Sequence, residues 1–143
     1  MNVCKIVAVV CLVICGCSKK SGPPTVQALP VTGKVTLDGK PLPGADVVFL
    51  IPDPPMAFAG TTKDDGSYQL QGVAGKQPPK GHCKVMISRM LKPDGTLVPP
   101  GTPPAMAFAT ESLPPKYSMA NSTELSADVL EGGGEFNFAM TSK

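Results

Sequence analysis

Hydrophobic and polar residues alternate with a period of two along most of the chain after residue 30, which is the pattern of β-strands with one buried face. A further run, residues 47–51, is apolar on both faces, as is typical of a central or covered strand. The alternation predicts inward-facing side chains in four segments: Val31, Val35 and Leu37; Cys83, Val85 and Ile87; Leu125, Ala127 and Val129; and Phe136, Phe138 and Met140.

Clusters of Gly, Pro and Asp separate these segments. Asp64, Asp65 and Gly66 stand between FAGTTK and SYQLQG and predict a hairpin, because Asp-Gly suits the positive φ angles of tight turns. Residues 91–115 hold seven prolines and predict a long irregular loop. No segment shows a helical repeat with caps. Seven short strands joined by turns therefore predict an all-β fold, an antiparallel β-sandwich.

The first residues follow a different pattern. Lys5 precedes nine consecutive apolar residues, 6–14, too few for a bilayer-spanning helix of about 20 residues but typical of a signal peptide. The run that ends at Gly16 and Cys17 resembles the bacterial lipobox, although Ile14 and Cys15 replace its usual Leu and Ala or Ser. This resemblance implies cleavage after Gly16 and a palmitate-bearing lipid on Cys17. An ordinary secretory signal and an N-terminal anchor helix are the alternatives.

The lipobox divides the chain into three parts. Residues 1–16 are a lipoprotein signal peptide, residues 17–29 are the lipidated Cys17 and a flexible polar tether, and residues 30–143 are the folded domain. We expect the protein to be anchored to a membrane on its periplasmic side or at the cell surface. Ser18 after the lipidated residue resembles the outer-membrane sorting signal of bacteria with two membranes. Cys83 is then the one remaining thiol, so no intramolecular disulfide is expected.

Composition excludes several classes of function. The net charge of +2 gives no basic field for nucleic acid, and the chain has one His, two Tyr and no Trp. His82 and Cys83 are neighbours on a strand and point to opposite faces, so they cannot form a catalytic dyad. Asp64 and Asp65 lack the ligand spacing of an EF-hand and indicate a turn. We expect no metal, no cofactor and no catalysis, and we give the sequon at Asn121 little weight beside a bacterial lipobox.

Three stretches resemble a known family. Residues 31–49 (VTGKVTLDGKPLPGADVVF) are similar to the first two strands of a carboxypeptidase regulatory-like domain, a small prealbumin-like (transthyretin-like) sandwich. Residues 60–70 resemble the family's next hairpin, and residues 81–88 resemble its G-x-Y-x-V-x-I strand, with Cys83 at the usual Tyr. The C-terminal part resembles a group of lipoproteins abundant in planctomycete bacteria.

The resemblance implies a seven-stranded antiparallel Greek-key β-sandwich that serves as an accessory or interaction module. Hydroxyisourate hydrolases and intradiol dioxygenases have related folds, but the former need several His and an Arg and the latter two Tyr and two His, whereas this chain has one His. We therefore expect a non-catalytic structural or protein-interaction module of the cell envelope. The alternative is a module that binds a polysaccharide, with Tyr117 as the candidate stacking residue because Tyr68 faces the core.

A repeated apolar segment is the remaining candidate site. Residues 54–59 (PPMAFA) are echoed by residues 103–109 (PPAMAFA), and both copies lie in or beside proline-rich connections. Met56, Phe58, Met106 and Phe108 are the large apolar side chains of the two copies. They either cap an end of the sandwich or form an apolar surface for a partner or for the membrane.

Overall fold

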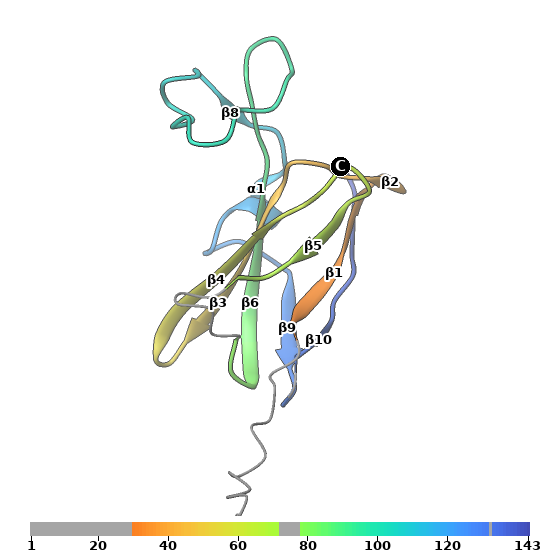
Figure 1. The fold of residues 1–143 in the computed structure, drawn as a ribbon, viewed down its shortest axis with the longest axis vertical. Helices are drawn as coiled ribbons and strands as arrows, with labels where there is room; N and C mark the ends of the chain where they lie inside the picture. The colour runs from red at the N-terminus through yellow and green to blue at the C-terminus, as the bar shows by residue number, and fades with distance from the viewer. Residues whose placement is uncertain (1–29, 72–77, 132) are drawn as a thin grey trace, which may run out of the picture.

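A computed structural model describes residues 30–71, 78–131 and 133–143, so the predicted signal peptide, Cys17 and the tether lie outside the described residues. The described chain is all-β apart from one short helix, α1 (Pro115–Ser118), and this confirms the predicted class (Figure 1). The strands are β1 (Val31–Leu37), β2 (Lys40–Pro41), β3 (Asp46–Pro52), β4 (Pro55–Thr61), β5 (Ser67–Gln69), β6 (Gly81–Ser88), β7 (Met90–Leu91), β8 (Thr110–Glu111), β9 (Ser126–Val129), β10 (Gly134–Glu135) and β11 (Phe138–Met140). Each of the seven predicted segments contains a strand of three or more residues, and the additional strands have two residues each.

One sheet is antiparallel throughout, in the order β4-β3-β6-β9. β3 lies inside this sheet, as its two apolar faces predict, and pairs with β4 on one side and with β6 on the other. β9 completes the sheet along the far edge of β6. The inner face carries Val47, Phe49 and Ile51 from β3, which are all buried.

The second sheet is built around β1. β2 and β5 pair with it in antiparallel fashion, whereas β10 and β11 run parallel to it. The parallel pairs depart from the antiparallel arrangement that the alternation predicts. They arise because the chain leaves β9 in the first sheet, forms a bridge between Leu130 and Gly133, and then follows β1 in the same direction as β1.

The predicted hairpin at residues 64–66 is only partly present. A tight turn does form there, in which Gly66 has a φ of 76° and its N–H donates to the carbonyl of Lys63. However, the flanking strands belong to different sheets, because β4 pairs with β3 and β5 pairs with β1. The two sides still meet in antiparallel register, through hydrogen bonds between Ala59 and Gln71 and from the N–H of Lys63 to the carbonyl of Ser67. The hairpin is therefore confirmed at its turn and at one bridge, but not as a continuous pair of strands.

The core lies between these two sheets. Phe49 contacts Phe136 and Phe138 edge to face, with ring centroids 5.7 and 6.2 Å apart, so both sheets share one aromatic cluster. Gly33 allows close approach of the chain here, since a Cβ on it would lie 1.7 Å from the carbonyl oxygen of Phe136. The predicted inward sets are confirmed: nine of the twelve side chains are buried, and Leu37, Leu125 and Phe136 are partly buried against the core.

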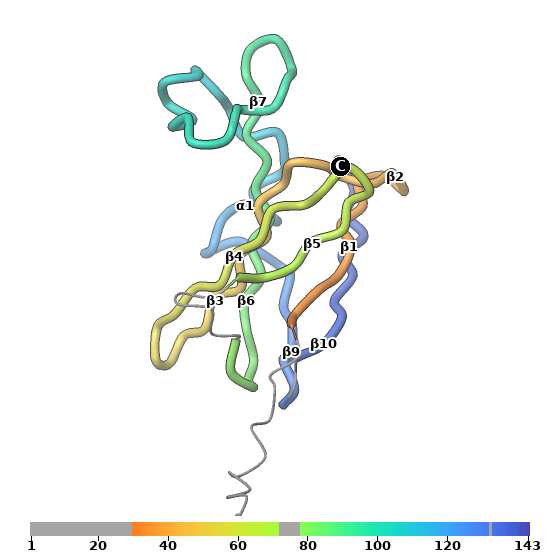
Figure 2. The backbone as a smooth tube through the Cα atoms, in the orientation of Figure 1, coloured from red at the N-terminus to blue at the C-terminus, as the bar shows by residue number. Residues whose placement is uncertain are grey.

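The strand pairings show which residues lie at each end of the domain. Val31 pairs with Gly134 at the end where β6 begins, and Ser88 marks the opposite end. Residues 92–109 project from that opposite end as a loop closed at its base by the β7–β8 pair (Figures 1 and 2). We call residues 92–109 the projecting loop. It therefore lies far from the point where the chain enters the domain.

Candidate functional site

The first copy of the repeated apolar segment contributes one side chain, Phe58, to the core. Residues 56–59 lie in β4, where Phe58 is 5% exposed and pairs with Phe49 of β3. Met56 is 39% exposed and pairs with Ile51 near the turn into β4. The prediction that Phe58 belongs to an interaction loop was wrong, because Met-Ala-Phe-Ala also has the period of a strand and turns Phe58 inward.

The second copy is exposed. Met106 and Phe108 have exposed fractions of 77% and 80%, and both lie in the projecting loop. The two copies lie at opposite ends of the domain, so they do not pack together as a cap. Of the chain's seven aromatic side chains, all within the described residues, Phe108 is the only one that is largely exposed.

Backbone hydrogen bonds fix the tip of the projecting loop. The N–H of Met106 donates to the carbonyl of Pro103, and the N–H of Ala109 donates to the carbonyl of Pro104 at 3.0 Å. The N–H of Phe108 donates to the carbonyl of Ala105 at 3.3 Å. The last two bonds have the 6→1 and 5→2 pattern of a Schellman motif, which ends a helical turn with a residue in the left-handed region.

Phe108 occupies that left-handed position, with a φ of 50°. The position usually holds Gly, because a left-handed backbone costs other residues about 1–2 kcal/mol. Since Phe108 is 80% exposed, its contacts within the domain offset little of this cost. The tip thus holds an aromatic ring in solvent in a strained conformation, and such strain is concentrated at functional sites.

The base of the projecting loop is held by Glu111 in β8. Its carboxylate accepts hydrogen bonds from the hydroxyl of Ser88, from the N–H of Arg89 at 3.0 Å and from the N–H of Leu113 at 2.9 Å. Within the loop, Asp94 accepts from the N–H and the hydroxyl of Thr96, and these bonds hold the pKa of Asp94 below its ordinary value. The loop is therefore tied to the sheet at its base.

A groove of about 580 Å³ separates the projecting loop from the neighbouring ends of β3 and β4. It is lined by Gly44, Asp46, Thr61, Met90, Leu97, Val98, Pro99, Pro100, Gly101, Thr102 and Pro104. We call this the Asp46 groove. A second hollow, of about 300 Å³, lies over β1 and β5 and is more polar, with Lys34, Lys63 and Glu135 at its border.

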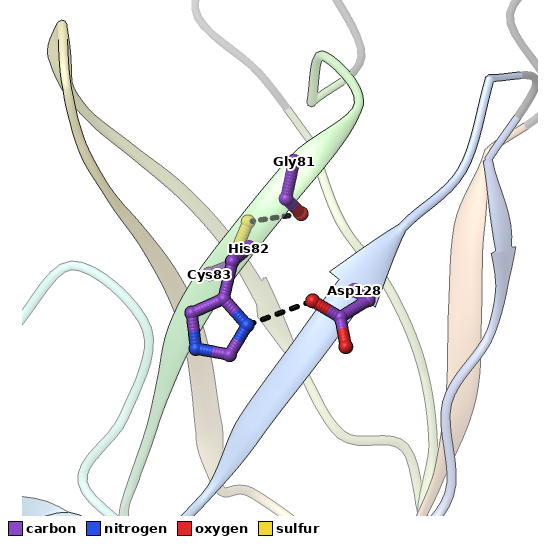
Figure 3. A network of polar contacts seen from close by, with 4 residues as sticks. All are labelled: Gly81, His82, Cys83 and Asp128. Carbon is purple, nitrogen blue, oxygen red and sulfur yellow. Dashed lines mark hydrogen bonds and ion pairs between the residues drawn. The ribbon is translucent and has the colours of Figure 1, made fainter.

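His82 and Cys83 point away from each other, as their adjacent positions on a strand predict (Figure 3). Cys83 is fully buried, and this burial raises the pKa of its thiol. The His82 Nδ1 atom lies 2.7 Å from a carboxylate oxygen of Asp128 on β9, and both side chains are exposed. An exposed pair of this kind contributes little to stability. No nucleophile–base dyad forms here.

Neither tyrosine offers a surface for a sugar ring to stack on. Tyr68 is 3% exposed, and its hydroxyl donates to the carbonyl of Phe136 at 2.8 Å. Tyr117 is 8% exposed, with its hydroxyl 3.4 Å from that of Thr141. The prediction of Tyr117 as an exposed stacking residue was wrong, because residues 115–118 form a helical turn whose Tyr packs on the core.

The acidic turn behaves as its sequence predicts. Asp65 accepts hydrogen bonds from the N–H and the hydroxyl of Ser67, which lower the pKa of its carboxyl. In residues 30–71, 78–131 and 133–143, no group of three or more His, Cys, Asp or Glu side chains lies close enough to hold a metal ion. None of the helical structure in those same ranges is long and apolar enough to cross a membrane.

Comparisons with known proteins identify no relative of this chain. No family model, no curated protein and no solved structure matches the chain.

Proposed function

We propose that the chain is a non-catalytic lipoprotein of the bacterial cell envelope that contacts another protein through the projecting loop. Its domain would be a prealbumin-like, seven-stranded Greek-key β-sandwich, held to the membrane by lipid on Cys17. The resemblances to a lipobox and to a carboxypeptidase regulatory-like domain support the anchor and the class of module.

The exposure of Met106 and Phe108 at a strained tip is the observation that carries the proposal. Burying a Phe or Met side chain stabilises a fold by about 1.5–3 kcal/mol. Met106 and Phe108 contribute little of this free energy to the domain, because both are largely exposed. Aromatic side chains and Met are enriched in protein interfaces. In addition, loops longer than about 12–15 residues inside a compact domain are commonly functional.

The position of the projecting loop favours a protein over the membrane as the partner. β1 begins with Val31 at one end of the domain, and the loop extends from the other end (Figure 1). An anchor on the N-terminal side of Val31 approaches the domain from the end that lacks the loop. Phe108 lies at the end of the domain opposite to Val31, and this position favours contact with other envelope components over contact with the anchoring membrane.

Two measurements test this proposal separately. The anchor is tested by growing cells with radiolabelled palmitate: we expect label on the wild-type chain and none on Cys17→Ala, and label retained in that variant contradicts the anchor. The contact is tested by co-purification after in-cell cross-linking. We expect Phe108→Ser to lose the partner, while Leu130→Ser, which alters another largely exposed apolar residue at the other end, keeps it.

A further inference from the structure

The Asp46 groove has a fixed floor beside the base of the projecting loop. Thr62 is 4% exposed, and its hydroxyl donates to the carbonyl of Leu42 at 2.6 Å and accepts from the N–H of Ala45 at 2.8 Å. The N–H of Gly44 donates to the carbonyl of Thr62 at 3.0 Å. These bonds join the chain before β3 to the chain after β4, so this side of the groove is formed before any ligand binds.

The wall formed by the projecting loop is apolar and stiff. Pro99, Pro100 and Pro104 have fixed φ angles, which lowers the conformational entropy that binding would cost. Leu97 packs over Gly44 so closely that a Cβ there would lie 2.4 Å from its side chain. Most of the lining is aliphatic or proline, and such a surface binds apolar groups better than it binds the hydroxyls of a sugar.

Asp46 is the only ionisable residue that lines the groove. One of its carboxylate oxygens accepts a hydrogen bond from the hydroxyl of Thr61 at 2.8 Å. No Lys, Arg or His nitrogen forms an ion pair with it among the residues that the structure describes. Lys92 is the one basic residue of the projecting loop, and its Nζ atom lies 3.4 Å from a carboxylate oxygen of Asp94. The groove thus combines apolar walls with one carboxylate that lacks a cation.

We infer that the Asp46 groove binds an extended segment of the partner protein that carries one Lys or Arg between apolar side chains. The cationic side chain would pair with Asp46, and its apolar neighbours would contact Leu97, Val98 and the prolines. The groove volume of about 580 Å³ lies within the usual range of binding clefts. Because Pro104 links the groove to the tip, the same segment can reach Met106 and Phe108. This inference rests on the proposed contact with a protein.

Random heptapeptides displayed on phage and panned against the full-length chain in detergent micelles provide the test. We expect enrichment of sequences with one Lys or Arg flanked by apolar residues. A synthetic peptide with an enriched sequence should bind on the order of tenfold more weakly to Asp46→Asn, because the charge-assisted hydrogen bond between the basic side chain and the exposed carboxylate is lost. Asn can still accept the bond from Thr61, so this variant is expected to keep the fold. Asp128→Asn, which alters another exposed acid, should bind as the wild type does.

Four outcomes overturn the inference: no enrichment, enrichment without basic residues, equal binding by Asp46→Asn, or displacement of the peptide by an oligosaccharide or by a second copy of the chain. The cross-linking of Phe108→Ser separates this from the proposed function. If position 108 still determines capture of a protein while the peptide test fails, the contact stands and the basic segment is excluded. If the peptide test fails and position 108 does not determine the capture of a protein either, both the basic segment and the protein contact are excluded.

Discussion

The repeated Met-Ala-Phe-Ala segment offers an internal comparison for the packing of one local sequence in two environments. Phe58 in β4 is 5% exposed, whereas Phe108 in the projecting loop is 80% exposed. We consider Phe58→Ala and Phe108→Ala, which remove the same atoms after the same two residues. The two substitutions therefore differ in what surrounds the ring.

The expected magnitudes follow from these exposures. Phe58→Ala removes a buried ring from its contact with the core and should destabilise the protein by about 3–5 kcal/mol. Phe108 buries about a fifth of its surface, roughly 40 Å² if a Phe side chain offers about 200 Å². At about 25 cal/mol per Å², that loss is about 1 kcal/mol at most. Ala keeps the left-handed backbone at position 108, so the strain is unchanged.

Urea denaturation followed by circular dichroism measures both changes on the full-length chain in the same detergent. We expect the midpoint to fall strongly for Phe58→Ala and only slightly for Phe108→Ala, with similar slopes. A loss of 3 kcal/mol or more for Phe108→Ala would show that the ring packs as a cap in solution. That result would remove the main support for the loop as a contact surface.

Three further predictions concern single residues. Phe108→Gly should keep stability within about 1 kcal/mol of the wild type and exceed Phe108→Ala, because Gly relieves the left-handed strain; paired urea titrations measure this. Burial raises the pKa of Tyr68 above its ordinary value, so the folded state holds the neutral phenol and stability should fall as the pH rises above about 10, the pKa of an exposed tyrosine. Tyr68→Phe should lose about 1 kcal/mol with its bond to Phe136 and should reduce that alkaline dependence, while the part that comes from the buried Cys83 thiol remains, as measured by denaturation at pH 8 and pH 11. Cys83, which is fully buried, should react with Ellman's reagent only after urea unfolds the protein; rapid reaction of the native chain would show that the core opens locally.

The strands were predictable from the sequence because their alternation is local. The inward positions of Val35, Val85 and Ala127 follow from a period of two within single segments. The pairing of β5 with β1 was not predictable from the sequence, since a turn signal does not specify which strands it connects. The helical turn that buries Tyr117 is only four residues long and has no capping side chain to predict it.

Only part of the candidate site was predictable, because the rest of it also depends on contacts between segments far apart in the sequence. The apolar repeat drew attention to Met106 and Phe108, but identical tetrapeptides carry no information on which copy is buried. Register and chain direction decide this, and both depend on long-range pairing. The Asp46 groove joins residues 44–61 to residues 90–104, a juxtaposition that no local pattern contains.

The most direct test of the account is photo-crosslinking in living cells with a photoreactive amino acid at position 108 and, in a matched strain, at position 130. Leu130 is 71% exposed and follows β9, at the end away from the projecting loop. We expect a discrete protein adduct from position 108 that is absent from position 130. Adducts that are the same at both positions, adducts to lipid at position 108, or no adduct there would contradict it.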